Sequence, residues 1–113
     1  MKEFVKIVVY VPVAHAKKVK EALIQADCGH IGNYDCCSFS VKGIGCFRPL
    51  KGAKPFVGKL GEVEEVEEER IETVCEKSRF QEVVVAIKKV HPYEEPVIDI
   101  YPLCTWRCPS SRR

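Results

Sequence analysis

Apolar and polar residues follow one another in blocks that predict four strands and two helices. Residues 4–11 are almost uninterruptedly apolar and β-branched, with Val5, Ile7 and Val9 on one face, which is typical of a strand. The segments 34–41, 63–75 and 97–101 show the other strand-like patterns. Between them, two stretches have apolar residues at helical spacing instead.

The two helical stretches each have one apolar face. In the first, this face consists of Ala16, Val19, Leu23 and Ala26, and Gly29 provides a stop signal where the chain can turn left-handed. In the second, the face consists of Phe80, Val83, Val84, Ile87 and Val90. Ser78 and Gln81 before it fit a capping box, and Pro92 cannot continue the helix.

The order of these elements predicts the fold class. A βα unit, a strand followed by a long connection, and a βαβ unit give an α+β, ferredoxin-like sandwich. It has a four-stranded, mainly antiparallel sheet with two helices on one face. We place this domain at residues 1–103, with a C-terminal tail at 104–113. The connection carries the glycines from Gly43 to Gly61 and the apolar anchors Phe47, Leu50, Phe56 and Val57.

Length and composition narrow the class of protein. A chain of 113 residues is expected to form one domain. The formal charge of +2 is too small to indicate a nucleic acid or an anionic membrane as a partner. No apolar run approaches the roughly 20 residues that span a bilayer, and charges interrupt the start, so we expect a cytoplasmic protein. In that compartment the seven cysteines are expected to be thiols rather than a disulfide framework.

Candidate chemistry gathers where each helix gives way to a strand. The first junction, residues 29–39, and the second, residues 91–96, combine glycines or prolines with polar side chains. We expect the two junctions to lie together and form one surface site for a small molecule or a protein. The predicted ligand-binding residues are His30, Asn33, Tyr34, Asp35, Arg48, His91, Tyr93, Glu94 and Glu95.

Other interpretations of these residues stay open. His30, Asp35, His91 and Glu94 are ligand types that suit a divalent metal, and would be the site of a metal-dependent hydrolase or other enzyme. The same residues could instead only stabilise turns. Cys104 and Cys108 supply two of the four ligands that a structural zinc needs. The sequence therefore identifies no cofactor.

Three segments carry a family resemblance: GHIGNYDxCSF at 29–39, GxFRPxxGAxPFxG at 45–58 and HPYEEPxxDIYPL at 91–103. Together they closely resemble the inserted domain of the NGG-interacting-factor-three-like family, also labelled the YqfO or dinuclear-metal GTP cyclohydrolase-like family. The resemblance runs over residues 2–103. It implies a ferredoxin-like unit similar to the CutA and PII regulatory proteins, and hence a homo-oligomer, most simply a trimer.

The resemblance also bears on function. The family's two-metal centre belongs to the flanking domain, whose histidine motifs have no matching positions in these 113 residues. No metal ligand is therefore carried over. The remaining implication is a small regulatory or ligand-sensing module, with the metal-dependent enzyme as the alternative.

Overall fold

The computed structural model describes residues 2–104 as one antiparallel sheet covered by two helices. The elements are β1 (Phe4–Pro12), α1 (Ala16–Gln25), β2 (Phe39–Phe47), β3 (Glu64–Glu76), α2 (Phe80–Val90) and β4 (Ile98–Pro102), with short 3-10 turns before each helix. The strand order is β2-β3-β1-β4, and every neighbouring pair is antiparallel. This confirms the predicted α+β, ferredoxin-like fold. Of the predicted tail at 104–113, only Cys104 lies within the described residues.

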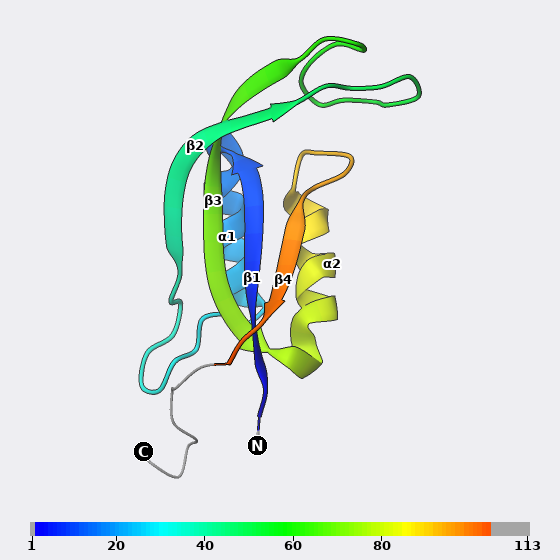
Figure 1. Cartoon of the computed structure of the whole chain (residues 1–113). Coiled ribbons are helices and arrows are strands. Elements are labelled where there is room, and N and C mark those ends of the chain that lie inside the picture. The colour runs from blue at the N-terminus through cyan, green and yellow to red at the C-terminus, as the bar shows by residue number, and fades with distance from the viewer. Residues whose placement is uncertain (1, 105–113) are drawn as a thin grey trace.

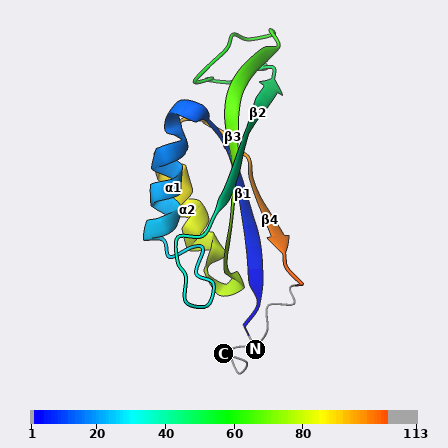
Figure 2. The same ribbon diagram turned by 90° about the vertical axis from the view of Figure 1, so that its left-hand side faces the viewer.

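Both helices cover the same face of the sheet (Figure 2). The core is the face of β1 that carries Val5, Ile7 and Val9, packed with Leu23 of α1 and Ile87 of α2. The exposed fraction of these five side chains is 3% or less. The apolar faces predicted for the first strand and for both helices therefore meet in one core.

The two helices run in opposite directions, which decides where their ends lie. In the β1–β3 ladder Phe4 pairs with Glu76 and Pro12 pairs with Glu68, so we call the two ends of the sheet the Phe4 end and the Pro12 end. Helix α1 starts just after Pro12 and runs to the Phe4 end. Helix α2 starts just after Glu76 and runs back to the Pro12 end (Figure 1).

Strand β2 differs from its predicted position at 34–41. It begins at Phe39, continues to Phe47, and thus includes Gly43 and Gly45, which the sequence placed in the long connection. A Cβ atom at Gly45 would meet the carboxylate of Glu68 on β3, so a side chain here would displace that carboxylate from its present position. The connection is therefore shorter, and β2 and β3 form a hairpin that extends beyond the helical layer (Figure 1).

The predicted capping box at Ser78 is wrong. Ser78 lies in the 3-10 turn Lys77–Arg79, and the residue that caps α2 is Arg79, which makes no side-chain cap hydrogen bond. Because Ser78 lies in this turn, it does not occupy the N-cap position of α2 and cannot form the capping box. Within residues 2–104, neither helix has the length and apolar character needed to cross a membrane.

Candidate ligand-binding site

A pocket of about 470 Å³ opens at the Pro12 end of the sheet. Its walls come from three separate segments: the end of β2 with Phe47 and Arg48, the connection with Phe56, and the loop after α2 with Tyr93 and Glu94. Two of the three sequence motifs, those at 45–58 and 91–103, therefore meet here. Of the predicted binding residues, Arg48, Tyr93, Glu94 and Glu95 line this pocket.

His91 fixes the loop that carries Tyr93. Its ring Nε2 lies 2.7 Å from the carbonyl oxygen of Tyr10, and its Nδ1 lies 3.1 Å from the backbone nitrogen of Tyr93. Because Nδ1 accepts the Tyr93 amide hydrogen, the proton of the neutral ring is on Nε2 and is donated to Tyr10. The side chain is buried, and this burial lowers the pKa of His91. His91 is thus neutral, and its two hydrogen bonds hold the loop that carries Tyr93 to the pocket.

Tyr93 joins the loop to β3. Its hydroxyl donates a hydrogen bond of 2.7 Å to Oε2 of Glu68. Burial of the ring, together with this bond to a carboxylate, raises the pKa of Tyr93, so the phenol keeps its proton at neutral pH. The same Glu68 carboxylate occupies the space that a side chain at Gly45 would fill.

Aromatic rings hold the connection on the body of the domain. The ring of Phe56 lies 5.4 Å from His15, edge to face, and 6.3 Å from Tyr93, measured between centroids. The ring of Phe47 lies 6.0 Å from Tyr93, at 61° to it. Inclined rings at these separations attract one another through their quadrupoles, by about 0.5–1.5 kcal/mol per pair.

A polar contact also links the 45–58 and 91–103 motifs. The backbone N–H of Lys54 donates to Oε2 of Glu94 over 2.8 Å, across 40 positions of the sequence. One carboxylate oxygen of Glu94 therefore accepts this hydrogen bond, and the other oxygen remains available to the solvent or a ligand. Glu95 and Arg48 are exposed.

The first junction lies at the other end of the molecule. The amide of Gly29 donates to the carbonyl of Val74 over 2.7 Å, and Val74 pairs with Lys6 near the Phe4 end. The prediction that the two junctions form one site is therefore wrong, as Figure 1 shows. The cause is topological: the two helices are antiparallel, so their C-terminal ends point to opposite ends of the sheet.

The side chains of this first junction are exposed and make few contacts. Tyr34 has an exposed fraction of 74%, and Asn33 and Asp35 are also exposed. His30 Nε2 lies 3.2 Å from the carbonyl oxygen of Gly32 within the same turn. They do not approach His91 or Glu94.

The separation also bears on the alternative of a metal site at these four residues. His30 and Asp35 lie at the Phe4 end, whereas His91 and Glu94 lie at the Pro12 end. Among residues 2–104, no three side chains of His, Cys, Asp or Glu are grouped so that they could hold a metal ion. The alternative of a metal-dependent hydrolase at these four residues has no counterpart in this geometry.

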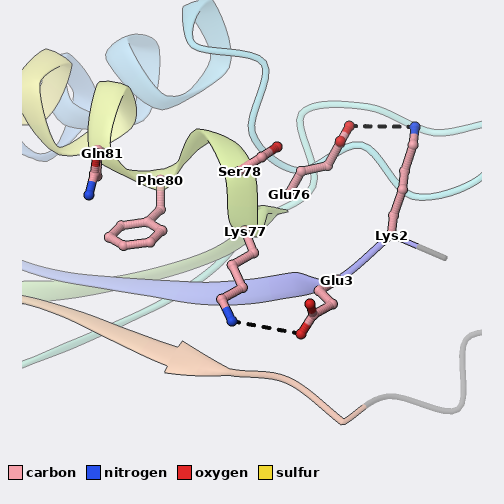
Figure 3. Close-up of a pocket in the computed structure, with 7 residues that line it drawn as sticks. All are labelled: Lys2, Glu3, Glu76, Lys77, Ser78, Phe80 and Gln81. Atoms are coloured by element: carbon pink, nitrogen blue, oxygen red, sulfur yellow. Dashed lines mark ion pairs between the residues drawn. The ribbon is translucent and has the colours of Figure 1, made fainter.

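A second hollow, of about 550 Å³, lies at the Phe4 end (Figure 3). Its charged side chains pair with one another: Lys77 Nζ lies 3.7 Å from Glu3, and Lys2 Nζ lies 3.6 Å from Glu76. Exposed pairs of this kind contribute about 0–1 kcal/mol, and none of the residues that line this hollow belongs to the three motifs. We therefore place the candidate site in the pocket at the Pro12 end.

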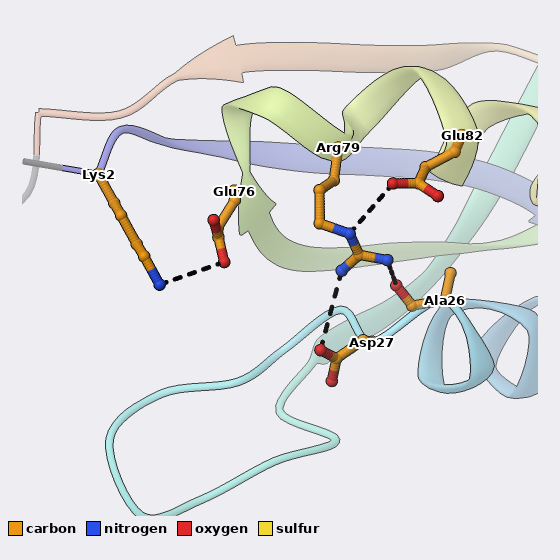
Figure 4. Close-up of polar contacts among 6 residues, drawn as sticks. All are labelled: Lys2, Ala26, Asp27, Glu76, Arg79 and Glu82. Atoms are coloured by element: carbon orange, nitrogen blue, oxygen red, sulfur yellow. Dashed lines mark hydrogen bonds and ion pairs between the residues drawn. The ribbon is translucent and has the colours of Figure 1, made fainter.

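Beside this hollow, Arg79 ties the start of α2 to the end of α1 (Figure 4). Its guanidinium donates to the carbonyl oxygen of Ala26 over 2.7 Å and to Oε1 of Glu82 over 3.1 Å. A third nitrogen lies 3.8 Å from Asp27 Oδ2. This network satisfies a carbonyl at the end of α1 and is structural rather than part of a site.

Sequence reasoning missed three residues of the pocket region: Tyr10, His15 and Glu68. Glu68 looked like one member of a solvated acidic run, and Tyr10 and His15 were unremarkable in their segments. The sequence feature that could have indicated Glu68 is a glycine, Gly45, on the strand beside a glutamate-rich strand. That feature identifies Glu68 only once the β2–β3 register is known.

Comparison with known proteins identifies relatives over most of the chain. It is 53% identical over 98 residues to a Bacillus subtilis protein named GTP cyclohydrolase 1 type 2 homolog, and 52% identical to a protein of the same name from Halalkalibacterium halodurans. Each match covers 87% of this chain but 26% of the relative, so the chain spans about a quarter of their length. No family model matches the chain.

Solved structures agree with these relatives. The Bacillus cereus protein related to NIF3 superposes with a TM-score of 0.81 at 46% identity, over 92% of this chain and 26% of that one. CutA1 from Pyrococcus horikoshii superposes with a TM-score of 0.66 at 17% identity, over 89% of this chain and 84% of that one. The second likeness shows a shared fold.

Proposed function

Because this chain belongs to the NGG-interacting-factor-three-like family of GTP cyclohydrolase 1 type 2 homologs, we propose that it is a small ligand-sensing module of that family. Its binding site is the pocket at the Pro12 end, with Arg48, Phe56, Tyr93 and Glu94 as principal contacts. The site binds a small molecule and reports its presence through the β2–β3 hairpin and the connection.

One observation carries this proposal: two motifs far apart in sequence build the two sides of one pocket. The bond from Lys54 to Glu94 and the ring contact between Phe56 and Tyr93 bridge them. Binding residues are commonly placed on loops that a rigid scaffold positions, and this pocket has that construction.

Two residues at the pocket, His91 and Tyr93, have structural roles rather than catalytic ones. A general base needs a free lone pair near neutral pH, but both ring nitrogens of His91 are already hydrogen bonded within the protein. Tyr93 is held in its protonated form by burial and by Glu68. Neither group is available to accept a proton from a substrate.

A screen of metals, nucleotides and metabolites by thermal shift tests the proposal, because a ligand raises stability by mass action. We expect a hit to shift the amide resonances of the 48–57 and 91–97 loops. Phe56→Ala and Glu94→Ala should weaken that binding, whereas the control Lys59→Ala, outside the pocket, should not. A hit that maps to the Phe4 end and survives both pocket variants would refute this placement.

We further propose that the chain assembles as a homotrimer. Two features support an assembly: the outer edges of β2 and β4 have no partner strand within the described residues, and β2 exposes Phe39 and Val41. The exposed fractions of these side chains are 68% and 50%. Uncovered strand edges and apolar side chains are commonly protected by neighbouring subunits.

Light scattering coupled to gel filtration tests the assembly. We expect three copies per particle, and a shift to monomer in the double variant Phe39→Glu, Val41→Lys. The control Val85→Lys, on the exposed side of α2, should leave the mass unchanged. A monomeric wild type at tens of micromolar would refute the assembly, and a stable dimer would refute the trimer.

A further inference from the structure

The pocket at the Pro12 end has an unbalanced set of charges. Its lining includes one guanidinium, that of Arg48, and three carboxylates, those of Glu68, Glu94 and Glu95. No ion pair within residues 2–104 involves any of the four. The surplus of carboxylates therefore gives the pocket a negative potential, which raises the local concentration of cations.

The hydrogen bonds of the pocket leave this surplus in place. Glu68 accepts from the hydroxyl of Tyr93, and Glu94 accepts from the backbone N–H of Lys54. Both donors are neutral, so the bonds orient the carboxylates without cancelling their charge. Each of these two carboxylates also has a second oxygen that accepts no hydrogen bond from the described residues.

The apolar part of the lining is aromatic. Phe47, Phe56 and Tyr93 contribute three rings, and the planes of Phe47 and Phe56 are inclined to that of Tyr93 by 61° and 55°. All three rings line the same cavity, and that of Tyr93 is inclined to the other two. A cation near a ring face is attracted by the ring quadrupole, and an apolar body is favoured by the same surface.

From these two observations we infer that the pocket selects an organic ammonium cation with an apolar body. The carboxylates hold the charged nitrogen, and the rings of Phe47, Phe56 and Tyr93 hold the body. This inference rests on the proposed binding function of the same pocket. It adds the charge and chemical class of the ligand.

Three probes of matched shape test the charge. 2-Phenylethylammonium is a cation, 2-phenylethanol is its neutral analogue, and 3-phenylpropionate is an anion of similar size. Binding is measured by nuclear magnetic resonance titration of the full chain at neutral pH. We expect the cation to bind at least about fivefold tighter than the alcohol, the combined effect of one ring contact and a net negative site. The anion should bind weakest.

Two variants and one control locate the effect. Glu95→Gln should reduce the preference for the cation over the alcohol, because it removes one negative charge and keeps the shape. Phe56→Leu should weaken both probes. Glu67→Gln makes the same charge change on β3 outside the pocket and should leave the preference unchanged.

The outcomes separate the inference from the function it rests on. Equal binding of cation and alcohol, or tighter binding of the anion, overturns the cation class while the pocket stands as a binding site. If none of the three probes shifts the pocket resonances at millimolar concentration, the cation class is also overturned. The proposed function then depends on whether a hit from the wider screen maps to the same loops.

Discussion

Replacement of His91 by alanine tests whether this side chain holds the Tyr93 loop in place beside the pocket. The variant removes the acceptor for the Tyr93 N–H and the donor for the Tyr10 carbonyl, at 3.1 and 2.7 Å. A partly buried polar group left without a partner costs about 1–3 kcal/mol, and two are affected. We therefore expect a loss of about 2–6 kcal/mol in the free energy of unfolding, a large share of the roughly 5–15 kcal/mol typical of a domain.

The same residue predicts how stability depends on pH. Burial lowers the pKa of His91 below its ordinary value of 6.5, so at mildly acidic pH the unfolded chain binds a proton that the folded chain does not. The stability that His91 contributes is therefore complete above pH 6.5. It falls as the pH decreases from 6.5 towards the pKa of the folded state.

Urea unfolding at pH 8 and at pH 5 measures both effects. His91→Gln should flatten the part of the pH dependence that lies below pH 6.5. The matched control is His30→Ala, because His30 is exposed and makes one bond within its own turn; it should change stability by less than about 0.5 kcal/mol. A loss below about 0.5 kcal/mol for His91→Ala, or an unchanged pH dependence in His91→Gln, would refute the reasoning.

Three further predictions concern the scaffold. Leu23→Ala should destabilise by about 2–5 kcal/mol in urea unfolding, because it leaves a cavity against β1; a loss below about 0.5 kcal/mol would contradict the packing. Arg79→Ala should cost about 1–3 kcal/mol by leaving the Ala26 carbonyl unpaired, with Arg79→Lys recovering only part, and an unchanged midpoint would count against the network. Burial raises the pKa of Cys28 to about 12, so mass spectrometry after brief alkylation of folded protein should find exposed Cys46 modified and Cys28 intact; the reverse order would contradict the burial.

Periodicity was enough to predict the scaffold. The apolar faces containing Val5, Leu23 and Ile87 are dense and regular, and each lies in the core as expected. The family resemblance is confirmed by relatives at 52% and 53% identity. The predicted position of β2 was wrong because glycines at 43 and 45 interrupt the apolar pattern of the strand. A glycine in a strand resembles a turn signal until its cross-strand neighbour is known.

The grouping of the candidate residues was predicted only in part. Four residues of the second and third motifs, Arg48, Tyr93, Glu94 and Glu95, line one pocket, and their role in binding stays a prediction. The error was to group them with His30, because both junctions follow a helix. Sequence position relative to a helix does not fix which end of the sheet a residue reaches; the direction of the helix does.

The reach of the β2–β3 hairpin beyond the helices has a mechanical consequence. Along most of β1 the sheet is stiffened by the helical layer, but the far part of the hairpin extends past this layer (Figure 1). There it is attached to the body by contacts that include the rings of Phe56 and Tyr93 and the bond from Tyr93 to Glu68. A molecule filling the pocket would add contacts on both sides of that attachment and restrict bending of the hairpin. The hairpin would then convert occupancy of a small cavity into a change of stiffness over the length of two strands.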